Sequence, residues 1–173
     1  MKNFLKQLGI ITLLVGFFVP SAVAQKKKAD KDTEQWRYEI EAAAKGTQGT
    51  ALIKVWSYSK DANVAMEQAK KNAVHGIVFR GYSANSNEPA GQRPLLANPN
   101  ADQEHKDFFK DFFKTGGKYL KYVSLVNNGA IGLGDRIKIG KEYKIGVVIS
   151  VNVAELRRDL EDAGIVKKLS SGF

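Results

Sequence analysis

The sequence predicts an α+β domain: a single, mostly antiparallel sheet of about six strands with about three helices packed on it. Two observations lead to this fold class. Runs of aromatic and β-branched residues, several of them alternating with polar residues, are separated by glycine-containing turns, which is typical of hairpins. Three stretches, 61–76, 105–115 and 152–163, instead space their apolar residues as one face of a helix does.

The N-terminus has the pattern of an export signal. Two lysines precede an apolar run, 8–19, and the small residues Ala22 and Ala24 occupy the positions expected before a cleavage site at Gln25. Residues 1–24 are therefore predicted to be a signal peptide, because the apolar run is shorter than the roughly 20 residues that a membrane span needs. The chain has no cysteine, which excludes a lipid-modified N-terminal cysteine, disulfides and thiolate metal sites.

The expected mature chain, 25–173, is long enough for one domain with a real core. The charged, aperiodic stretch 25–34 is predicted to be a disordered lead-in, 35–167 the single domain, and 168–173 a flexible tail. Two lysines and no acidic residue lie in the predicted signal peptide, so cleavage lowers the net charge from +9 to +7. A basic exported protein can meet anionic lipids, cell-wall polymers or acidic glycans, although ordinary solubility also explains the charge. No later stretch is long and apolar enough to span a bilayer.

The first half of the domain is expected to open with a hairpin. Trp36, Tyr38 and Ile40 alternate with charged residues, and a second β-rich run, 51–59, follows the glycine-containing turn 45–50.

The stretch 61–76 is expected to be a helix that packs closely on the sheet, because one of its faces is rich in small residues: Ala62, Ala65, Met66, Ala69 and Ala73. The following run GIVFRGY, 76–82, is predicted to be a buried strand. Residues 50–81 would then form a strand–helix–strand unit, with a right-handed crossover if its two strands are parallel.

The middle of the chain contains a long polar segment. Residues 83–104 are rich in asparagine and hold three prolines, and loops of this length are usually functional or disordered. The run 118–126 is predicted to be a strand and the NNG that follows a turn. The stretch 135–151 is predicted to be a hairpin, whose second strand turns four branched residues to one face: Ile145, Val147, Ile149 and Val151.

The last helix has clear end signals. Asn152 is an N-cap candidate with Glu155 three residues later, as in a capping box. Gly164 stands where a left-handed residue ends a helix, and Ile165 could then contact Leu160. The apolar face is predicted to consist of Leu156, Leu160 and Ala163.

The stretch HKDFFKDFFKTGGKY, 105–119, repeats the unit Asp-Phe-Phe-Lys. On a helix with 100° per residue, its four phenylalanines fill one arc, with lysines along one side and aspartates along the other. Burial of each ring would contribute roughly 1.5–3 kcal/mol, so the arc is expected to be core. A groove for a partner and a membrane or ligand contact remain the alternatives. His105 falls in the same arc and is expected to be partly buried.

No catalytic, cofactor-binding or metal-binding constellation is evident. His75 is expected to cap the Ala-faced helix or to be half-buried, and His105 with one nearby carboxylate makes a weak metal site. Glu39 and Glu41 share an exposed strand face. The glycines of GAIGLGDR precede a strand rather than a helix, so they indicate turns and not a phosphate loop.

Aromatic and basic residues interleave in WRY, KVWSYSK and KYLKYV. On an exposed sheet such residues could stack sugar rings or nucleobases. The export signal argues against nucleic acid, and aromatic residues in strands mostly have one buried face.

Two segments carry a resemblance to known bacterial envelope domains. They are ALIKVWSYSKDANVAMEQAKKNAVHGIVFRG and YKIGVVISVNVAELRRDLEDAGI, which resemble the lipoprotein-20-like proteins and the N-terminal domain of flagellar assembly protein T. The resemblance implies an exported α/β domain with an Ala-rich helix on a sheet and a non-enzymatic role in the envelope. This chain lacks the lipidated cysteine of those lipoproteins and adds the 83–104 loop and the Phe helix, so no functional residue is carried over.

The sequence therefore favours an exported, non-enzymatic module that binds or scaffolds another envelope protein or an anionic cell-surface polymer or glycan. We expect a periplasmic location, with secretion or outer-membrane association as alternatives. The candidate partner-binding residues lie in the loop and the Phe helix: Arg93, Leu95, Leu96, Phe109 and Phe113. Two alternatives remain. A glycan- or cell-wall-acting hydrolase would need converging carboxylates in a cleft, and a carrier of a small apolar ligand would need a cavity beneath the Phe helix.

Overall fold

The computed structural model describes residues 28 and 31 and the ranges 36–86 and 91–168. The predicted signal peptide lies outside the described residues, as do nearly all of the lead-in and all of the tail beyond Lys168. The predicted fold class is confirmed: a mostly antiparallel sheet carries the helices, with five strands in the described part where about six were expected.

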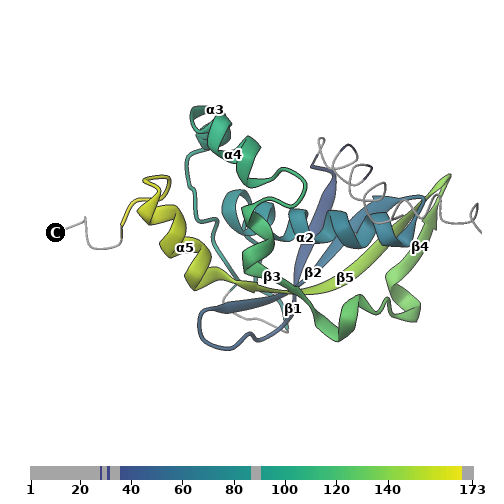
Figure 1. Cartoon of the computed structure of the whole chain (residues 1–173). Coiled ribbons are helices and arrows are strands. Elements are labelled where there is room, and N and C mark those ends of the chain that lie inside the picture. The colour runs from purple at the N-terminus through teal and green to yellow at the C-terminus, as the bar shows by residue number, and fades with distance from the viewer. Residues whose placement is uncertain (1–27, 29–30, 32–35, 87–90, 169–173) are drawn as a thin grey trace, which may run out of the picture.

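The sheet has the order β1-β2-β5-β3, with β4 also paired to β5, and each of these pairings is antiparallel (Figure 1). The long central strand β5 pairs on one side with the whole length of β2. On its other side β5 pairs first with β4 and then with β3. The strands are β1 (Tyr38–Ala44), β2 (Thr50–Ser59), β3 (Val123–Leu125), β4 (Arg136–Ile139) and β5 (Glu142–Asn152).

The two hairpins predicted from alternation, β1–β2 and β4–β5, are both present. The predicted inward face of β5 is fully buried at Ile145, Val147, Ile149 and Val151. Ile53 and Val55 of β2 are buried on the same side of the sheet.

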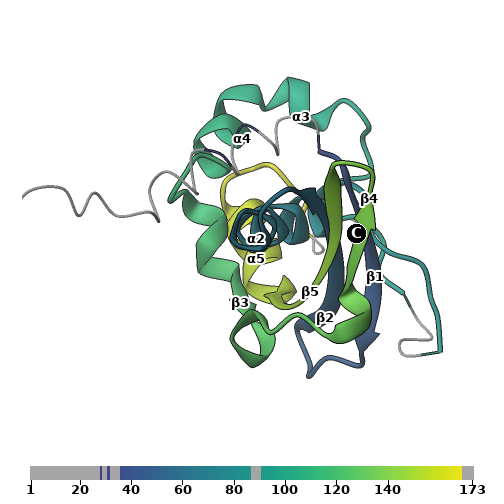
Figure 2. The ribbon, with the colours of Figure 1, turned by 90° about the vertical axis from the view of Figure 1, so that its right-hand side faces the viewer.

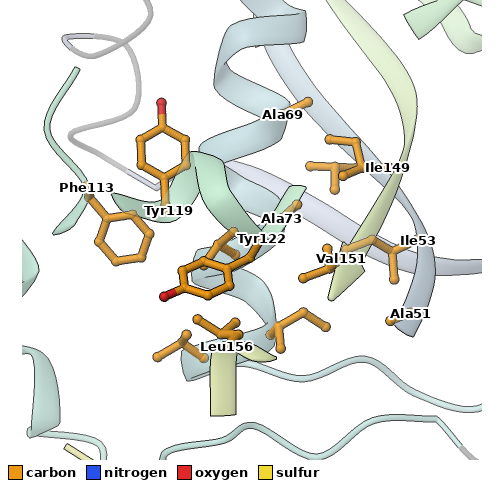
Figure 3. Packing of buried hydrophobic residues seen from close by; sticks show 14 of the residues in the cluster. Ala51, Ile53, Ala69, Ala73, Phe113, Tyr119, Tyr122, Ile149, Val151 and Leu156 are labelled. Atoms are coloured by element: carbon orange, nitrogen blue, oxygen red, sulfur yellow. The ribbon is translucent and has the colours of Figure 1, made fainter. Parts of the chain in front are cut away.

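Helix α2 (Ala62–Phe79) covers this face of the sheet. Its alanines Ala65, Ala69 and Ala73 are fully buried, as their spacing predicted. Figure 3 shows Ala69 and Ala73 between the sheet side chains and a group of aromatic rings. The small alanine side chains let the helix approach the sheet closely.

The predicted buried strand over 76–82 is wrong, and so is the strand–helix–strand unit. Helix α2 continues through Gly76 to Phe79. A methyl group at Gly76 would come within 2.7 Å of Ile40 Cδ1, so glycine serves close packing of α2 against β1 and does not end the helix. The residues from Ala73 to Val78 are all buried, and a helix surrounded on all sides has no polar face from which its period could be seen.

The segment 83–104 is tied to the rest of the fold at several points. Tyr82 and Gln92 pair backbone to backbone in both directions, at 2.8 and 2.9 Å. The N–H groups of Leu95 and Leu96 then donate to the Ile77 and Val78 carbonyl groups at the end of α2. These are carbonyls that a helix leaves without internal partners. Residues 83–86 and 91–104 of the predicted loop are described, and α3 (Ala101–Glu104) occupies its last turn.

The predicted Phe helix is α4 (Lys106–Phe112). The predicted strand over 118–126 is only partly right. A 3₁₀ helix, η1 (Lys118–Tyr122), precedes the short strand β3. The 3₁₀ helix repeats every three residues, so Tyr119 and Tyr122 lie on one side, and both are buried. Two further 3₁₀ turns, η2 (Val126–Gly129) and η3 (Leu133–Asp135), connect β3 to β4.

The last helix, α5 (Val153–Asp162), has the predicted ends. The Asn152 side chain accepts from the Glu155 N–H at 3.1 Å. Gly164 has φ of +72°, and the N–H of Ile165 donates to the Leu160 carbonyl at 2.9 Å, which is a Schellman end. Leu156 and Leu160 are buried as predicted. The predicted place of Ala163 on the apolar face is wrong, because this residue is exposed at the C-cap.

Figure 2 views α2 along its axis, with the sheet on one side of it and α3 and α4 above. The C-terminal half of α2 is therefore enclosed by sheet, α4 and η1, which explains its uniform burial. No helix in the described ranges is both long and apolar enough to cross a membrane.

Candidate ligand-binding pocket

A pocket of about 650 Å³ lies between the C-terminal half of α2, helix α4 and the segment that enters β1. Aromatic rings form much of its wall and lysines stand around it. Its lining residues are Trp36, Lys71, His75, Phe79, Asp102, Lys106, Phe109, Lys110, Phe113, Lys114 and Thr115. Its volume lies within the roughly 300–1,000 Å³ of ordinary small-molecule sites.

Helix α4 supplies one wall of the pocket. The predicted core position of its rings is confirmed: Phe109, Phe112 and Phe113 are at most 6% exposed, and Phe108 is half-buried. Phe109 packs edge-on against Phe79 of α2 with ring centroids 4.9 Å apart. Phe109 and Phe113 thus belong to the core and also face the pocket. A partner that reached them would have to enter the pocket, since they offer no open surface.

Trp36 and His75 form the adjoining part of the wall, where the Trp36 ring meets that of Phe113 edge-on with centroids 5.2 Å apart. Their rings are stacked with centroids 3.7 Å apart and planes 18° from parallel. Trp36 has φ of +46°, an unfavourable backbone conformation for a bulky residue. The Arg80 guanidinium donates to the Trp36 carbonyl at 2.9 Å and lies 4.1 Å from the Tyr38 ring centroid. Such conformations persist only where the surroundings enforce them, and they concentrate at functional sites.

Burial lowers the pKa of His75 to about 3, with the positive charge of Arg80 as the second cause. A hydrogen bond of 2.7 Å joins His75 Nδ1 to the Tyr38 hydroxyl group. Burial also raises the pKa of Tyr38 well above its usual range. Both groups are therefore neutral at physiological pH, so the His75 ring adds no charge to the pocket. The expected half-buried His75 is in fact buried, within α2 and not at its end.

Lysines supply the charge of the pocket. Lys106 and Lys110 lie one turn apart on α4, Lys114 follows just beyond its C-terminal end, and all three line the pocket. Lys114 pairs with Asp111 at 3.2 Å. In the described part of the chain, Lys106 and Lys110 form no ion pair or hydrogen bond through their side chains. Asp102 is the one carboxylate among the described lining residues.

The five candidate partner-binding residues are not brought together. Phe109 and Phe113 line the pocket just described. Leu95 and Leu96 line a separate pocket of about 530 Å³, together with His105, Arg157 of α5 and the residues 164–167 that follow this helix. Arg93 is exposed and lines neither of these two pockets. His105 is half-buried, as its place in the Phe arc predicted.

Sequence reasoning missed Trp36, His75 and Phe79 as pocket residues. No spacing in the chain links them to α4, because Trp36 lies just before β1 and the other two residues lie in α2. The lysine column beside the Phe arc was visible in the sequence, but only the fold shows that a pocket lies next to it.

The other face of the sheet carries only part of the interleaved aromatic and basic residues, those of KVWSYSK together with Arg37. The residues of KYLKYV are not on it, because Lys118–Tyr122 is a 3₁₀ helix whose tyrosines are buried. Trp56 lies over Gly146, and Arg37 stacks 4.1 Å from the centroid of the Tyr58 ring. The basic groups on this face are paired with carboxylates: Arg37 with Glu142 at 3.0 Å, Lys54 with Asp135 at 2.8 Å, and Lys144 with Glu39 at 2.6 Å. Its positive charges are thus already neutralised, which does not favour a polyanion here.

No group of three potential metal ligands occurs among the residues that the structure describes. No model of a protein family matches the chain, and comparisons with curated proteins and with solved structures find no match. The resemblance to lipoprotein-20-like and flagellar assembly protein T domains stays a prediction.

Proposed function

We propose that this protein is an exported, non-enzymatic binding protein whose α2–α4 pocket takes a small apolar ligand. The observation that carries the proposal is the pocket itself, with Trp36, Phe79, Phe109 and Phe113 in its wall. Concave sites of this volume, mostly apolar and with a few polar groups, are the usual places for small ligands. Export rests on the N-terminal pattern of the sequence.

The pocket favours this function over the two others that the sequence left open. A hydrolase with paired carboxylates needs two such groups in one cleft, and Asp102 stands alone among the described lining residues. A binding site for an anionic polymer on the open sheet face would have to compete with carboxylates that already hold Arg37 and Lys144.

Filling the mouth of the pocket tests the proposal. Thr115 lines the pocket and is exposed, so Thr115→Trp places a ring over the cavity without disturbing the core. We expect the chain beginning at Gln25 to enhance the fluorescence of the neutral dye N-phenyl-1-naphthylamine, and Thr115→Trp to weaken dye binding at least about tenfold.

Lys60→Trp is the matched control, because Lys60 is exposed and is not among the pocket-lining residues. Equal dye binding by Thr115→Trp and Lys60→Trp would contradict the proposal. Absence of dye binding to the parent chain would contradict it as well.

A further inference from the structure

Two lysines at the pocket have no carboxylate partner among the described residues, whereas several other basic groups of the protein do have one. Arg37, Lys54, Lys121 and Lys144 each pair with a carboxylate within about 3 Å. Lys106 and Lys110 pair with none among the described residues, although both line the pocket.

Their placement on one helix face is unfavourable for the helix alone. Like charges four residues apart on a helix repel each other. Lys106 and Lys110 form such a pair on α4, and Lys114 follows just beyond the end of this helix. Only Lys114 is relieved by a neighbouring acid, Asp111. The result is a local excess of positive charge beside an aromatic cavity whose histidine is neutral.

An apolar cavity next to unpaired cations is complementary to one kind of small molecule. The apolar part would contact the rings of Trp36, Phe79 and Phe109, and a negative head would stay near solvent, where Lys106 and Lys110 are exposed. A head placed there keeps much of its hydration, so it does not incur the full cost of burying a charge.

We infer that the ligand is an anionic amphiphile, with an acyl or aromatic body in the cavity and a carboxylate or phosphate head held by Lys106 and Lys110. This inference rests on the proposed function and adds the chemistry of the head group. Exposed ion pairs contribute modestly to binding, so the two lysines are expected to favour the anion over a neutral analogue by roughly three- to tenfold.

A series of ligands with one tail and different heads tests the inference. Decanol, decanoate and decyl phosphate, below the concentrations at which they aggregate, are titrated by calorimetry into the chain beginning at Gln25. The same titrations are made with the double variant Lys106→Gln/Lys110→Gln. The matched control, Lys138→Gln/Lys141→Gln, removes two exposed lysines of the β4–β5 hairpin and makes the same change in net charge.

We expect at least one of the two anions to bind about three- to tenfold more tightly than decanol in the parent and in the control. In the Lys106→Gln/Lys110→Gln variant that preference disappears while decanol affinity is kept. Whichever anion binds more tightly identifies the head as carboxylate or phosphate.

Equal affinity for decanol and both anions, or an anion preference that survives in Lys106→Gln/Lys110→Gln, would overturn the inference and leave the pocket as an apolar site. Failure of all three ligands to bind the parent would overturn the proposed function itself.

Discussion

His75 is a titratable side chain surrounded by four aromatic rings. The rings of Trp36, Tyr38, Phe79 and Phe113 have centroids within 6 Å of its own. Desolvation favours the uncharged form of a buried imidazole, and Arg80 adds repulsion, so its pKa falls to about 3. Only the Phe79 ring lies near His75 in the chain, so the sequence around His75 did not predict this environment.

The depressed pKa of His75 makes stability depend on pH in a defined direction. An unfolded histidine takes up a proton below about pH 6.5, whereas folded His75 stays neutral down to about pH 3. The unfolded state thus binds more protons between these values. The contribution of neutral His75 to the free energy of unfolding is fully present above about pH 6.5 and is lost as the pH falls toward 3. The loss is about 1.4 kcal/mol per pH unit within that window.

Denaturant unfolding from pH 7 to pH 4 measures this effect. We expect the free energy of unfolding of His75→Gln to fall less steeply with acidification than that of the parent. The two slopes should differ by nearly the amount that one bound proton contributes, about 1.4 kcal/mol per pH unit. His105→Gln, which replaces the half-exposed second histidine, controls for the loss of an imidazole. Identical slopes for the parent and His75→Gln would show that His75 is not held neutral.

Helix α5 and the C-terminal half of α2 illustrate what a single sequence can and cannot predict about an element. The ends of α5 follow from local chemistry, since Asn152 and Gly164 satisfy backbone groups within a few residues. The reason for a glycine at position 76 inside α2 is the close approach of Ile40, which lies far away in the chain. The prediction of a strand over η1 is wrong for a related reason. The three-residue repeat of a 3₁₀ helix appears here in a single pair of buried residues, Tyr119 and Tyr122, which is too short a pattern to recognise in the sequence.

The left-handed end of α5 gives a test of this local chemistry. Gly164 has φ of +72°, and a Cβ atom at this position would have no neighbour within 4 Å. Backbone strain alone therefore opposes a substitution. We expect Gly164→Ala to lower the free energy of unfolding by about 1–2 kcal/mol. Gly164→Asn should cost less, because asparagine tolerates this conformation better. Thermal or denaturant unfolding measures both, and equal stability of Gly164→Ala and the parent would contradict the Schellman end.

At the scale of the whole molecule, the fold class was predictable from the sequence but the pocket was not. The α+β class, the two hairpins and the buried Phe arc were predictable, because each is encoded in a local period of apolar residues. The pocket was not, because its wall brings together Trp36, α2 and α4 from three distant parts of the chain. The predicted contact residues were correspondingly divided, with Leu95 and Leu96 at a second pocket and Arg93 in neither.

The central claim is that the α2–α4 pocket binds a small apolar molecule. The chain has two tryptophans, of which Trp36 lines the pocket and Trp56 lies on the other face of the sheet, over Gly146. Their indole N–H signals in a ¹H–¹⁵N spectrum, assigned with Trp56→Phe, therefore report on two separate surfaces of one protein.

The most direct measurement is a titration of the ¹⁵N-labelled chain beginning at Gln25 with decanol. The account predicts that the Trp36 indole signal moves and saturates while the Trp56 signal stays in place. A Trp36 signal that does not move, or movement confined to Trp56, would contradict the account.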